Sequence, residues 1–445
     1  VIGGLVSATF LTLVLLPILY MWLEKEKPKK RKPRPVAMLL LLLLPGMMAM
    51  AQTPAVKTVN LDSLISMADR QNLQVQSLQQ ESAYWKQLQM AVADQGKTVA
   101  GAEYGKINSV NNDSRFSVNQ SFVLPVVYKR QRDYYKAGET SQQAMLQWKQ
   151  QELHREIKLV YWTMTDLLGR QQLLQQLDSV YSRVLVAATL RLKAGETNQL
   201  EKTSAEAQVA QLKLQLTQLQ SDLLIAQHQL QWLLNSPELY LPETGKDNVV
   251  QWYNPDTSSV GAHPLIKYRE EQVRLITAQT ALEKNKLVPD LSAGYNNMSI
   301  VGYQSPDGVT QQYYGPGRRF GTVSVSMGIP LFTKAARNKV KAGKLSEDAA
   351  RLSMEATSQE LKSRLQQYNE EYKKQWQLVQ YYDRDGIAQA DLIVNHAGQS
   401  FEKGQIGYLE WTMLMNHATT IRLSRLEALN QLNRARTEIE YLTGK

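Results

Sequence analysis

The sequence predicts a mainly helical protein with a small β part, built as a tandem duplication. Two stretches carry the clearest internal repeat, SFVLPVVYKRQRDYYKAG at 121–138 and SMGIPLFTKAARNKVKAG at 326–343. Each begins as an alternating strand, turns at a proline (Pro125 or Pro330) and continues as a basic helix. Both prolines precede a Lys-Ala-Gly by the same interval, and they lie about 205 residues apart. A repeat of this length indicates that one folding unit occurs twice.

A second pair of similar segments supports the duplication. KAGETNQLEK aligns with EKGQIGYLEW at nearly the same spacing, which matches Gly195 with Gly404 and Leu200 with Leu409. The repeat unit is therefore about 200 residues long. We expect a first repeat at 52–238, a connector at 239–261 and a second repeat at 262–445.

The composition excludes several classes of protein. None of the 445 residues is cysteine, which excludes disulfides, thiolate metal sites, cysteine nucleophiles and a lipidated N-terminal cysteine. Half of the formal net charge of +10 lies within residues 24–34. Because the rest of the chain has only a small excess of basic residues, a nucleic-acid partner is not expected.

The N-terminal part carries two apolar runs separated by a basic segment. Residues 1–23 hold no charge and are long enough for a transmembrane helix. A basic linker at 24–35 follows, and the positive-inside rule assigns it to the cytoplasm. The run at 36–51 has the layout of a secretory signal, with small residues at Ala49 and Ala51 and cleavage expected after Ala51. An ordinary membrane anchor with a basic stop signal is the alternative interpretation of the first run.

The first repeat is expected to hold a β-hairpin between helices. A helix at about 63–94 precedes a hairpin at about 98–123, whose second strand alternates apolar and polar residues. After Pro125 the chain predicts about sixty helical residues, with apolar side chains recurring every seven. The partner helix carries a heptad seam from Val209 to Leu233, which is typical of supercoiled helices. Sixty helical residues span roughly 90 Å, which suits a rod or the wall of a tube.

The second repeat is expected to follow the same order. A helix opens at His263 and Pro264, and a hairpin with a longer loop follows at about 290–330. A long helix from Thr333 to about Asn395 and a last helix at about 409–442 complete the repeat. Each repeat thus contributes one separate pair of strands. A single-chain membrane barrel needs at least about eight strands. The four strands of one chain must therefore add to a neighbour's sheet or close into a barrel with other subunits. Three chains would supply twelve strands.

These segments resemble a known family. The tandem helix–hairpin–helix repeat is similar to that of the TolC/CusC outer-membrane factors. Matching motifs are the IPLF turn at 329–332, HPLIKYREEQV from His263, LVPDLSAGY from Leu287 and the Gly-x4-Leu turns at Gly195 and Gly404. The resemblance covers about residues 60–445. It implies a homotrimer with a 12-stranded β-barrel in the outer membrane of a Gram-negative bacterium, surrounded by lipid, and a long α-helical barrel in the periplasm.

The resemblance also implies a function. Members of this family are passive exit ducts of tripartite efflux systems, which work with a periplasmic adaptor (membrane fusion protein) and an inner-membrane RND pump. Residues 1–23 resemble the last transmembrane helix of heavy-metal RND pumps. We therefore expect the tail of a pump fused to its own exit duct, and the export of heavy-metal cations. If the chain is not cleaved, this helix would stay in the inner membrane. Family members often carry a lipidated cysteine after the signal, but here that position is Gln52, so lipid anchoring is not expected.

Candidate functional residues gather at the predicted helix turns. Glu410 lies six residues after Gly404, where TolC-like proteins carry an acidic residue at the periplasmic entrance, and Glu201 takes the matching position in the first repeat. Three copies of Glu410 would form a carboxylate ring that attracts cations, whereas a solvated helix-turn carboxylate is the alternative. We assign closure of the entrance and docking of the partners to Gly195, Leu200, Gly404, Gly407 and Leu409. Simple helix capping is the alternative for the glycines.

No motif predicts an enzyme, a cofactor or a metal site. The sequence holds no Walker loop, HExxH, GxSxG or dinucleotide glycine fingerprint. Met413 and Met415 suggest a soft-metal site for Cu(I) or Ag(I), but residues two apart face different sides of a helix, so core packing is favoured. The histidines fall at no ligand spacing: His154, His228, His263, His396 and His417.

A second class of function remains open. An inner-membrane-anchored periplasmic coiled-coil or adaptor protein would have a structural role and would also carry long helices. Adaptors contain one helical hairpin, whereas this sequence predicts a duplicated pattern with strands far from the helix turns. The duplication therefore disfavours the adaptor.

Overall fold

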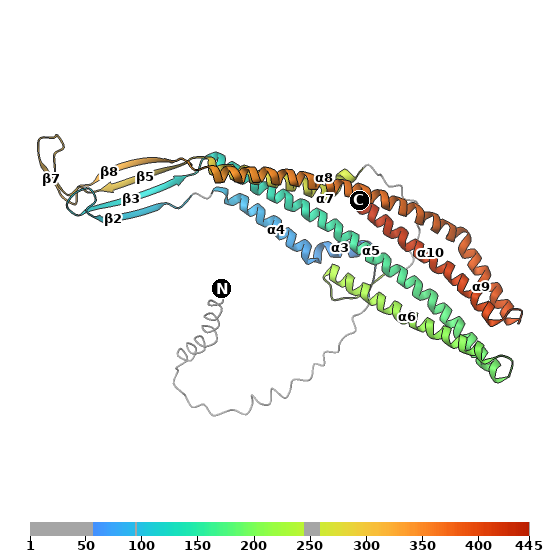
Figure 1. Cartoon of the computed structure of the whole chain (residues 1–445). Coiled ribbons are helices and arrows are strands. Elements are labelled where there is room, and N and C mark those ends of the chain that lie inside the picture. Colours follow the sequence, from blue (N-terminus) through green and yellow to red (C-terminus); the bar gives the residue numbers. More distant parts are fainter. Residues whose placement is uncertain (1–56, 94–95, 244–258, 445) are drawn as a thin grey trace, which may run out of the picture. The chain divides into compact units, whose positions relative to one another are not determined.

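The computed structural model describes residues 57–93, 96–243 and 259–444. Most of these residues lie in long helices, with one small sheet beyond the helices at one end and the helix-to-helix turns at the other (Figure 1). The mainly helical class with small sheets, predicted from the sequence, is confirmed. Within the described ranges, no helix has both the length and the apolar content needed to cross a bilayer.

Four strands form a single antiparallel sheet. They are β2 (Val99–Gly105), β3 (Asp113–Phe122), β5 (Asp290–Met298) and β8 (Phe320–Gly328), in the order β2-β3-β5-β8. The expectation of two separated pairs is wrong, because β3 of the first repeat pairs with β5 of the second. An isolated hairpin leaves both edges unpaired and is marginally stable. Joining the hairpins covers one edge of each.

Two further ladders were not expected. The loop between β5 and β8 forms a small hairpin of β6 (Gly302–Gln304) and β7 (Gln312–Tyr314). Within the predicted connector, β4 (Tyr240–Pro242) pairs in parallel with β1 (Lys57–Val59). This second ladder ties the start of the first repeat to the start of the connector.

The first repeat contains four helices. They are α3 (Leu61–Gln71), α4 (Leu73–Met90), α5 (Pro125–Lys193) and α6 (Gln199–Leu234), with a short 3₁₀ turn η2 (Ala91–Ala93) after α4. The single helix expected at 63–94 is therefore wrong. Asn72 divides it, because its extended backbone ends α3 while its side-chain oxygen accepts hydrogen bonds from the N–H groups of Gln74 (2.9 Å) and Val75 (3.1 Å). Asparagine is a favoured N-cap for this reason.

The second repeat has the same order with one interruption. Its elements are η3 (Ser259–Ala262), α7 (Pro264–Glu283), η4 (Lys284–Leu287), α8 (Lys334–Tyr381), the π-turn η5 (Tyr382–Gly386), α9 (Ile387–Glu402) and α10 (Tyr408–Thr443). The long helix expected at 333–395 thus extends to Glu402 and contains a π-turn. Asp383 in that turn pairs with Arg425 of α10 at 2.6 Å. The π-turn has no counterpart in α5, which is continuous.

The predicted heptad positions form the core of the first repeat. Leu153, Val160, Leu174 and Tyr181 of α5 are buried. The facing seam of α6 buries Val209, Leu212, Ala226, Leu230 and Leu233. Burial of each large apolar side chain contributes roughly 1.5–3 kcal/mol before the entropic cost. The α5–α6 pair is therefore held by two buried clusters, with Leu216, Leu219 and Leu223 partly buried between them.

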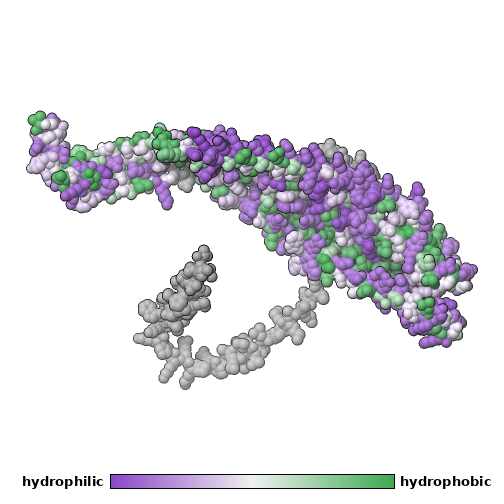
Figure 2. Space-filling model, in the orientation of Figure 1, coloured by the Kyte–Doolittle hydropathy of each residue, from purple (hydrophilic) through white to green (hydrophobic). Residues whose placement is uncertain are grey.

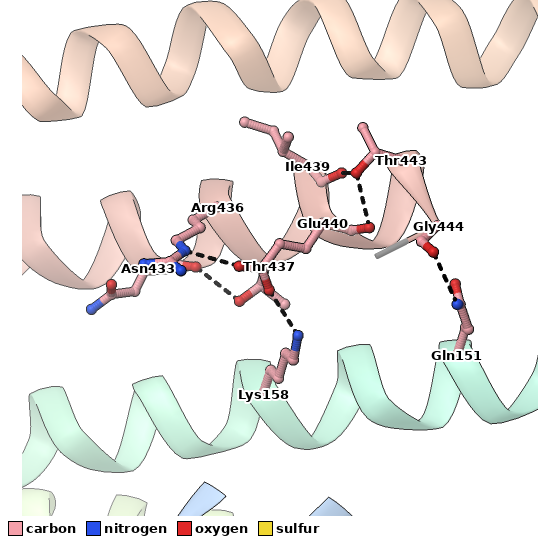
Figure 3. Close-up of polar contacts among 9 residues, drawn as sticks. All are labelled: Gln151, Lys158, Asn433, Arg436, Thr437, Ile439, Glu440, Thr443 and Gly444. Atoms are coloured by element: carbon pink, nitrogen blue, oxygen red, sulfur yellow. Dashed lines mark hydrogen bonds and ion pairs between the residues drawn. The ribbon is translucent and has the colours of Figure 1, made fainter. Parts of the chain in front are cut away.

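Ion pairs join the two repeats where α5 packs against the end of α10 (Figure 3). Lys158 Nζ donates to Glu440 Oε2 at 2.7 Å, and Arg436 Nε donates to Glu440 Oε1 at 2.9 Å. Burial tends to raise the pKa of Glu440, but the hydrogen bond and charge of Lys158, together with Arg436, outweigh it and lower that pKa. The carboxylate is therefore charged at neutral pH and links the repeats.

A second, more buried pair lies one turn away. Arg155 Nη2 donates to Glu438 Oε1 at 2.6 Å, and the Glu438 side chain is only 5% exposed. Trp148 Nε1 donates to the hydroxyl of Tyr441 at 3.1 Å. Because buried charges are costly without their partners, this pair fixes how the two repeats align.

Candidate functional site

The two helix turns predicted to matter have the same backbone conformation. Gly195 has φ +76° and Gly404 has φ +70°. After Gly195, the N–H of Glu196 donates to the carbonyl of Arg191 at 2.9 Å, and Gln405 donates to Ser400 in the same way at 2.8 Å. This is the Schellman C-cap, which favours glycine because the left-handed conformation is costly for other residues. A Cβ at either glycine would meet nothing within 4 Å, so conformation and not space requires glycine here.

The two candidate carboxylates differ in their surroundings. Glu201 is in the first turn of α6 and its backbone N–H donates to the cap residue Asn198 at 2.9 Å. Its carboxylate lies 3.3 Å from Arg191 Nη1, and its side chain is 15% exposed. Glu410 occupies the first turn of α10 and is exposed. In the described part of the chain its carboxylate makes no ion pair or hydrogen bond. Of these two carboxylates, Glu410 is therefore the one without a partner among the described residues.

The other turn residues predicted as sites are also exposed. Leu200 and Leu409 hold matching positions in α6 and α10 and are 73% and 74% exposed. Gly407 is the N-cap of α10 with φ −80°, and its Cβ position is open. Met413 is exposed while Met415 is buried, so the prediction that they face different sides is confirmed. The end of the molecule that carries the α5–α6 and α9–α10 turns, here called the tip, thus exposes two leucines whose side chains are not packed in a core.

An aromatic cluster that the sequence did not reveal joins the two turns. Trp411 of α10 is buried against Tyr181 of α5, with ring centroids 5.0 Å apart, and stacks on Phe401 of α9 at 5.2 Å. Burial raises the pKa of Tyr408, and the negative charge of Glu201 adds to the rise. The signal available in the sequence was Tyr181, which ends the heptad series of α5. The cluster places the tips of the two repeats beside each other.

The sheet has two unlike faces. Register across β3, β5 and β8 puts directly opposed residues on the same face. One face is mainly apolar and comprises Phe116, Val118, Phe122, Leu291, Ala293, Tyr295, Val323, Val325 and Met327, interrupted by Gln120 and Asn297. The other face carries mainly small polar residues and comprises Ser117, Asn119, Ser121, Ser292, Gly294, Asn296, Thr322, Ser324 and Ser326, with Arg115, Met298 and Phe320 in one row at its end.

The apolar face and both sheet edges are open in the single chain. Val323 is 75% exposed and Val325 is 78% exposed. Strands β2 and β8 each have one edge that pairs with no strand among the described residues. Exposed apolar patches and free edges of this kind mark surfaces that another chain or a lipid phase covers.

The prolines and the N-terminal residues complete the predicted sites. Pro125 is the first residue of α5, where its fixed φ suits a helix start. Pro330 lies between β8 and α8, four residues before the helix, so the two turns are not identical. Ala49 and Ala51, with the rest of residues 1–51, lie outside the described residues.

Possible metal ligands are scattered. In the ranges 57–93, 96–243 and 259–444, no three His, Asp or Glu side chains gather as a metal site. His154 Nε2 lies 2.8 Å from Asp69, and His228 Nδ1 lies 2.7 Å from Gln231. His263 is fully buried, and its Nδ1 accepts the N–H of Leu265 as an N-cap.

Comparison with solved structures identifies the fold. The chain is similar to the outer-membrane channel OprN (18% identity, TM-score 0.69, covering 86% of this chain and 89% of that one). It is also similar to the CmeC outer-membrane channel of Campylobacter jejuni (14%, 0.68, 86% and 85%) and to CusC (15%, 0.67, 94% and 99%). No protein-family model matches the sequence, and no curated protein does. The chain therefore has the fold of these channels.

Proposed function

We propose that the chain is the outer-membrane exit duct of a tripartite RND-type efflux system, a passive homotrimeric channel that exports heavy-metal cations. The observation that carries the proposal is the four-stranded sheet with one apolar and one polar face and two free edges. A lipid-facing barrel wall alternates in this way, with a polar interior. The similarity of the fold to outer-membrane channels supports the same conclusion.

The number of strands supports the trimer. Four strands are too few for a membrane barrel, whose smallest single-chain form has about eight. Pairing β8 of one chain with β2 of the next would cover both free edges, and three chains give twelve strands. The long helices of three chains would then form a tube that continues the barrel into the periplasm.

The turn residues support the docking of partners. We assign the periplasmic entrance to the α5–α6 and α9–α10 turns, with Glu410 as its cation-attracting carboxylate. Leu200 and Leu409 are exposed at matching places and offer apolar contacts to an adaptor or pump. The proposal of a heavy-metal cargo rests on the sequence of residues 1–23 alone. The proposal that residues 36–51 are a secretory signal rests on Ala49 and Ala51.

A pair of neighbouring substitutions tests the channel. Val325→Lys puts a charge on the proposed lipid face, at a cost of about 2–4 kcal/mol per chain near the bilayer centre. Ser324→Lys puts the same charge on the opposite, lumen face and is the matched control. We expect Val325→Lys to abolish recovery of folded protein in the outer-membrane fraction and Ser324→Lys to preserve it. Equal recovery of the two variants, or retention of the wild type in the inner membrane, would favour an anchored coiled-coil protein instead.

A further inference from the structure

A cluster of unpaired cations lies where the sheet gives way to the helices. The first three turns of α8 carry Lys334, Arg337, Lys339, Lys341 and Lys344, and no acidic residue. All five residues are exposed, and none of them forms an ion pair in the described part of the chain. The start of α5 adds exposed Lys129, Arg132 and Lys136, with one exposed carboxylate, Asp133, among them and no ion pair between these residues. We call these eight cationic residues the basic collar.

The basic collar is unfavourable for the isolated chain. Arg337 and Lys341 are four residues apart and Lys341 and Lys344 three apart, so like charges face each other along the helix. Cations in the first turn also oppose the helix macrodipole. Farther along α8, by contrast, Lys373 pairs with Glu370 at 2.7 Å and Lys374 with Glu371 at 2.6 Å. The cations of the collar repel one another, and no acidic side chain pairs with them in the described part of the chain. An external anion would reduce this repulsion.

Exposed apolar side chains border the collar on the sheet side. Ile329, Leu331 and Phe332 are 62%, 79% and 99% exposed. They lie in the turn between β8 and α8, directly before Lys334. Figure 2 shows strongly hydrophilic atoms over the first turns of α8 beside hydrophobic atoms over the strand-to-helix turn. Apolar side chains followed by cations reproduce the order of acyl chains and headgroups at a membrane surface.

We propose that the basic collar binds the phosphate groups of anionic phospholipids in the leaflet that faces the helices. This site rests on the proposed barrel, which would set Phe332 at the edge of the hydrocarbon layer. A headgroup layer is about 5–8 Å thick, and the seven residue-to-residue steps from Lys334 to Lys341 rise about 10 Å. The first cations therefore lie among the headgroups, and the last lie within a Debye length of about 8 Å.

Lipid titration of the full-length protein tests the site. The protein in neutral detergent is titrated with phosphatidylglycerol and with phosphatidylethanolamine that carry the same fluorescent acyl chain. Each Lys near an anionic surface contributes about fivefold in affinity, so we expect the wild type to prefer phosphatidylglycerol at least about tenfold. The triple variant Lys334→Gln/Lys339→Gln/Lys341→Gln removes three of the eight cations and should reduce the preference at least about tenfold.

Two control variants separate charge from folding. Lys193→Gln/Lys213→Gln/Lys403→Gln removes three exposed, unpaired lysines outside the collar and should keep the preference. Lys334→Arg/Lys339→Arg/Lys341→Arg keeps the charge and should also keep it. A wild type without preference, or a glutamine variant in the collar that retains it, would overturn the lipid site. Conductance of the wild type in neutral bilayers is recorded in parallel. A protein that conducts but shows no lipid preference would contradict only the lipid site. A protein that shows the lipid preference but does not conduct would contradict only the channel.

Discussion

At the scale of single residues, the two repeats use equivalent carboxylates differently. Glu201 is held by Arg191 and lies half inside the tip, whereas Glu410 is free. The sequence treats them as a matched pair, since both follow the turn glycine by six residues. What differs is the neighbour: Arg191 lies four residues before Gly195, and the residue four before Gly404 is Ser400. The loss of that arginine leaves Glu410 without a partner.

Glu410→Ala is therefore expected to lower the cation selectivity of the proposed channel. Three negative charges would disappear from a narrow ring, and the attraction of cations to the ring would disappear with them. The reversal potential in a salt gradient across a planar bilayer measures the effect. The double variant Arg191→Gln/Glu201→Gln should change it little, because it removes one positive and one negative charge and leaves the net charge of the turn unchanged. An unchanged reversal potential in Glu410→Ala would remove Glu410 from the entrance.

His263 makes the fold sensitive to acid. Burial, and then the charge of Arg364, lower the pKa of His263 to about 4, while an unfolded histidine titrates near 6.5. Between pH 6.5 and about 4, His263 binds a proton in the unfolded chain but not in the folded chain. The free energy of unfolding should thus fall between pH 6.5 and about 4, by up to about 3 kcal/mol, and this contribution should be constant above and below that window.

The variant His263→Asn isolates this contribution. Asparagine can still accept the N–H of Leu265 but cannot bind a proton in this range. Packing against the ring of Tyr441, now 4.8 Å away between centroids, would be lost, so the variant should be less stable at pH 7. Denaturant unfolding at several pH values should give a flatter pH dependence for the variant. Parallel curves for both proteins would show that His263 is not the group responsible.

At the scale of elements, the caps decide where helices end. Gly404→Ala should destabilise the α9–α10 turn by about 1 kcal/mol, since alanine must adopt a left-handed backbone although its Cβ has room. Gly398→Ala is the control, because Gly398 lies inside helix α9 and a Cβ there would meet nothing within 4 Å. Hydrogen exchange of the turn amides compares the two variants. Equal protection in both would mean that the left-handed conformation is not maintained in solution.

Much of the helical part was predictable because its signals are local. The seven-residue period along α5 and α6, and the glycines at the turns, act over short stretches of chain. The division at Asn72 was missed because one capping side chain outweighed a continuous helical pattern. The π-turn at 382–386 was missed because a single extra residue barely disturbs apolar spacing. Three-residue ladders such as β1–β4 carry too few residues to give any period.

At the scale of the whole described chain, the sequence predicted the strands but not how they join. The alternation of Phe116 and Val118 with Ser117 identifies β3 and its apolar face. Nothing in that alternation indicates that its second neighbour is β5, because the partner lies in the other repeat. The tip cluster around Trp411 was missed for the same reason, since its rings come from three helices. Contacts between distant segments leave no periodic trace.

The mass of the detergent-extracted protein tests the assembly directly. Light scattering with the detergent contribution subtracted should give three chains per particle, because the free edges of β2 and β8 need neighbours on both sides. The control is Ser324→Lys, which leaves the apolar face intact and should give the same mass as the wild type. A monomer or dimer for the wild type could not close a twelve-stranded barrel and would contradict the trimer.

The pairing of β3 with β5 also sets the order of folding. The β2–β3 hairpin closes locally, which takes microseconds, but β3 and β5 are separated by about 170–180 residues of chain. Contacts of such high sequence separation form slowly, because the entropy of the intervening chain is lost before they stabilise anything. The helices α5 and α6 must fold back on themselves before β5 can reach β3. Until then both hairpins expose edges on which aggregation begins, so the nascent chain needs protection for as long as its two halves remain apart.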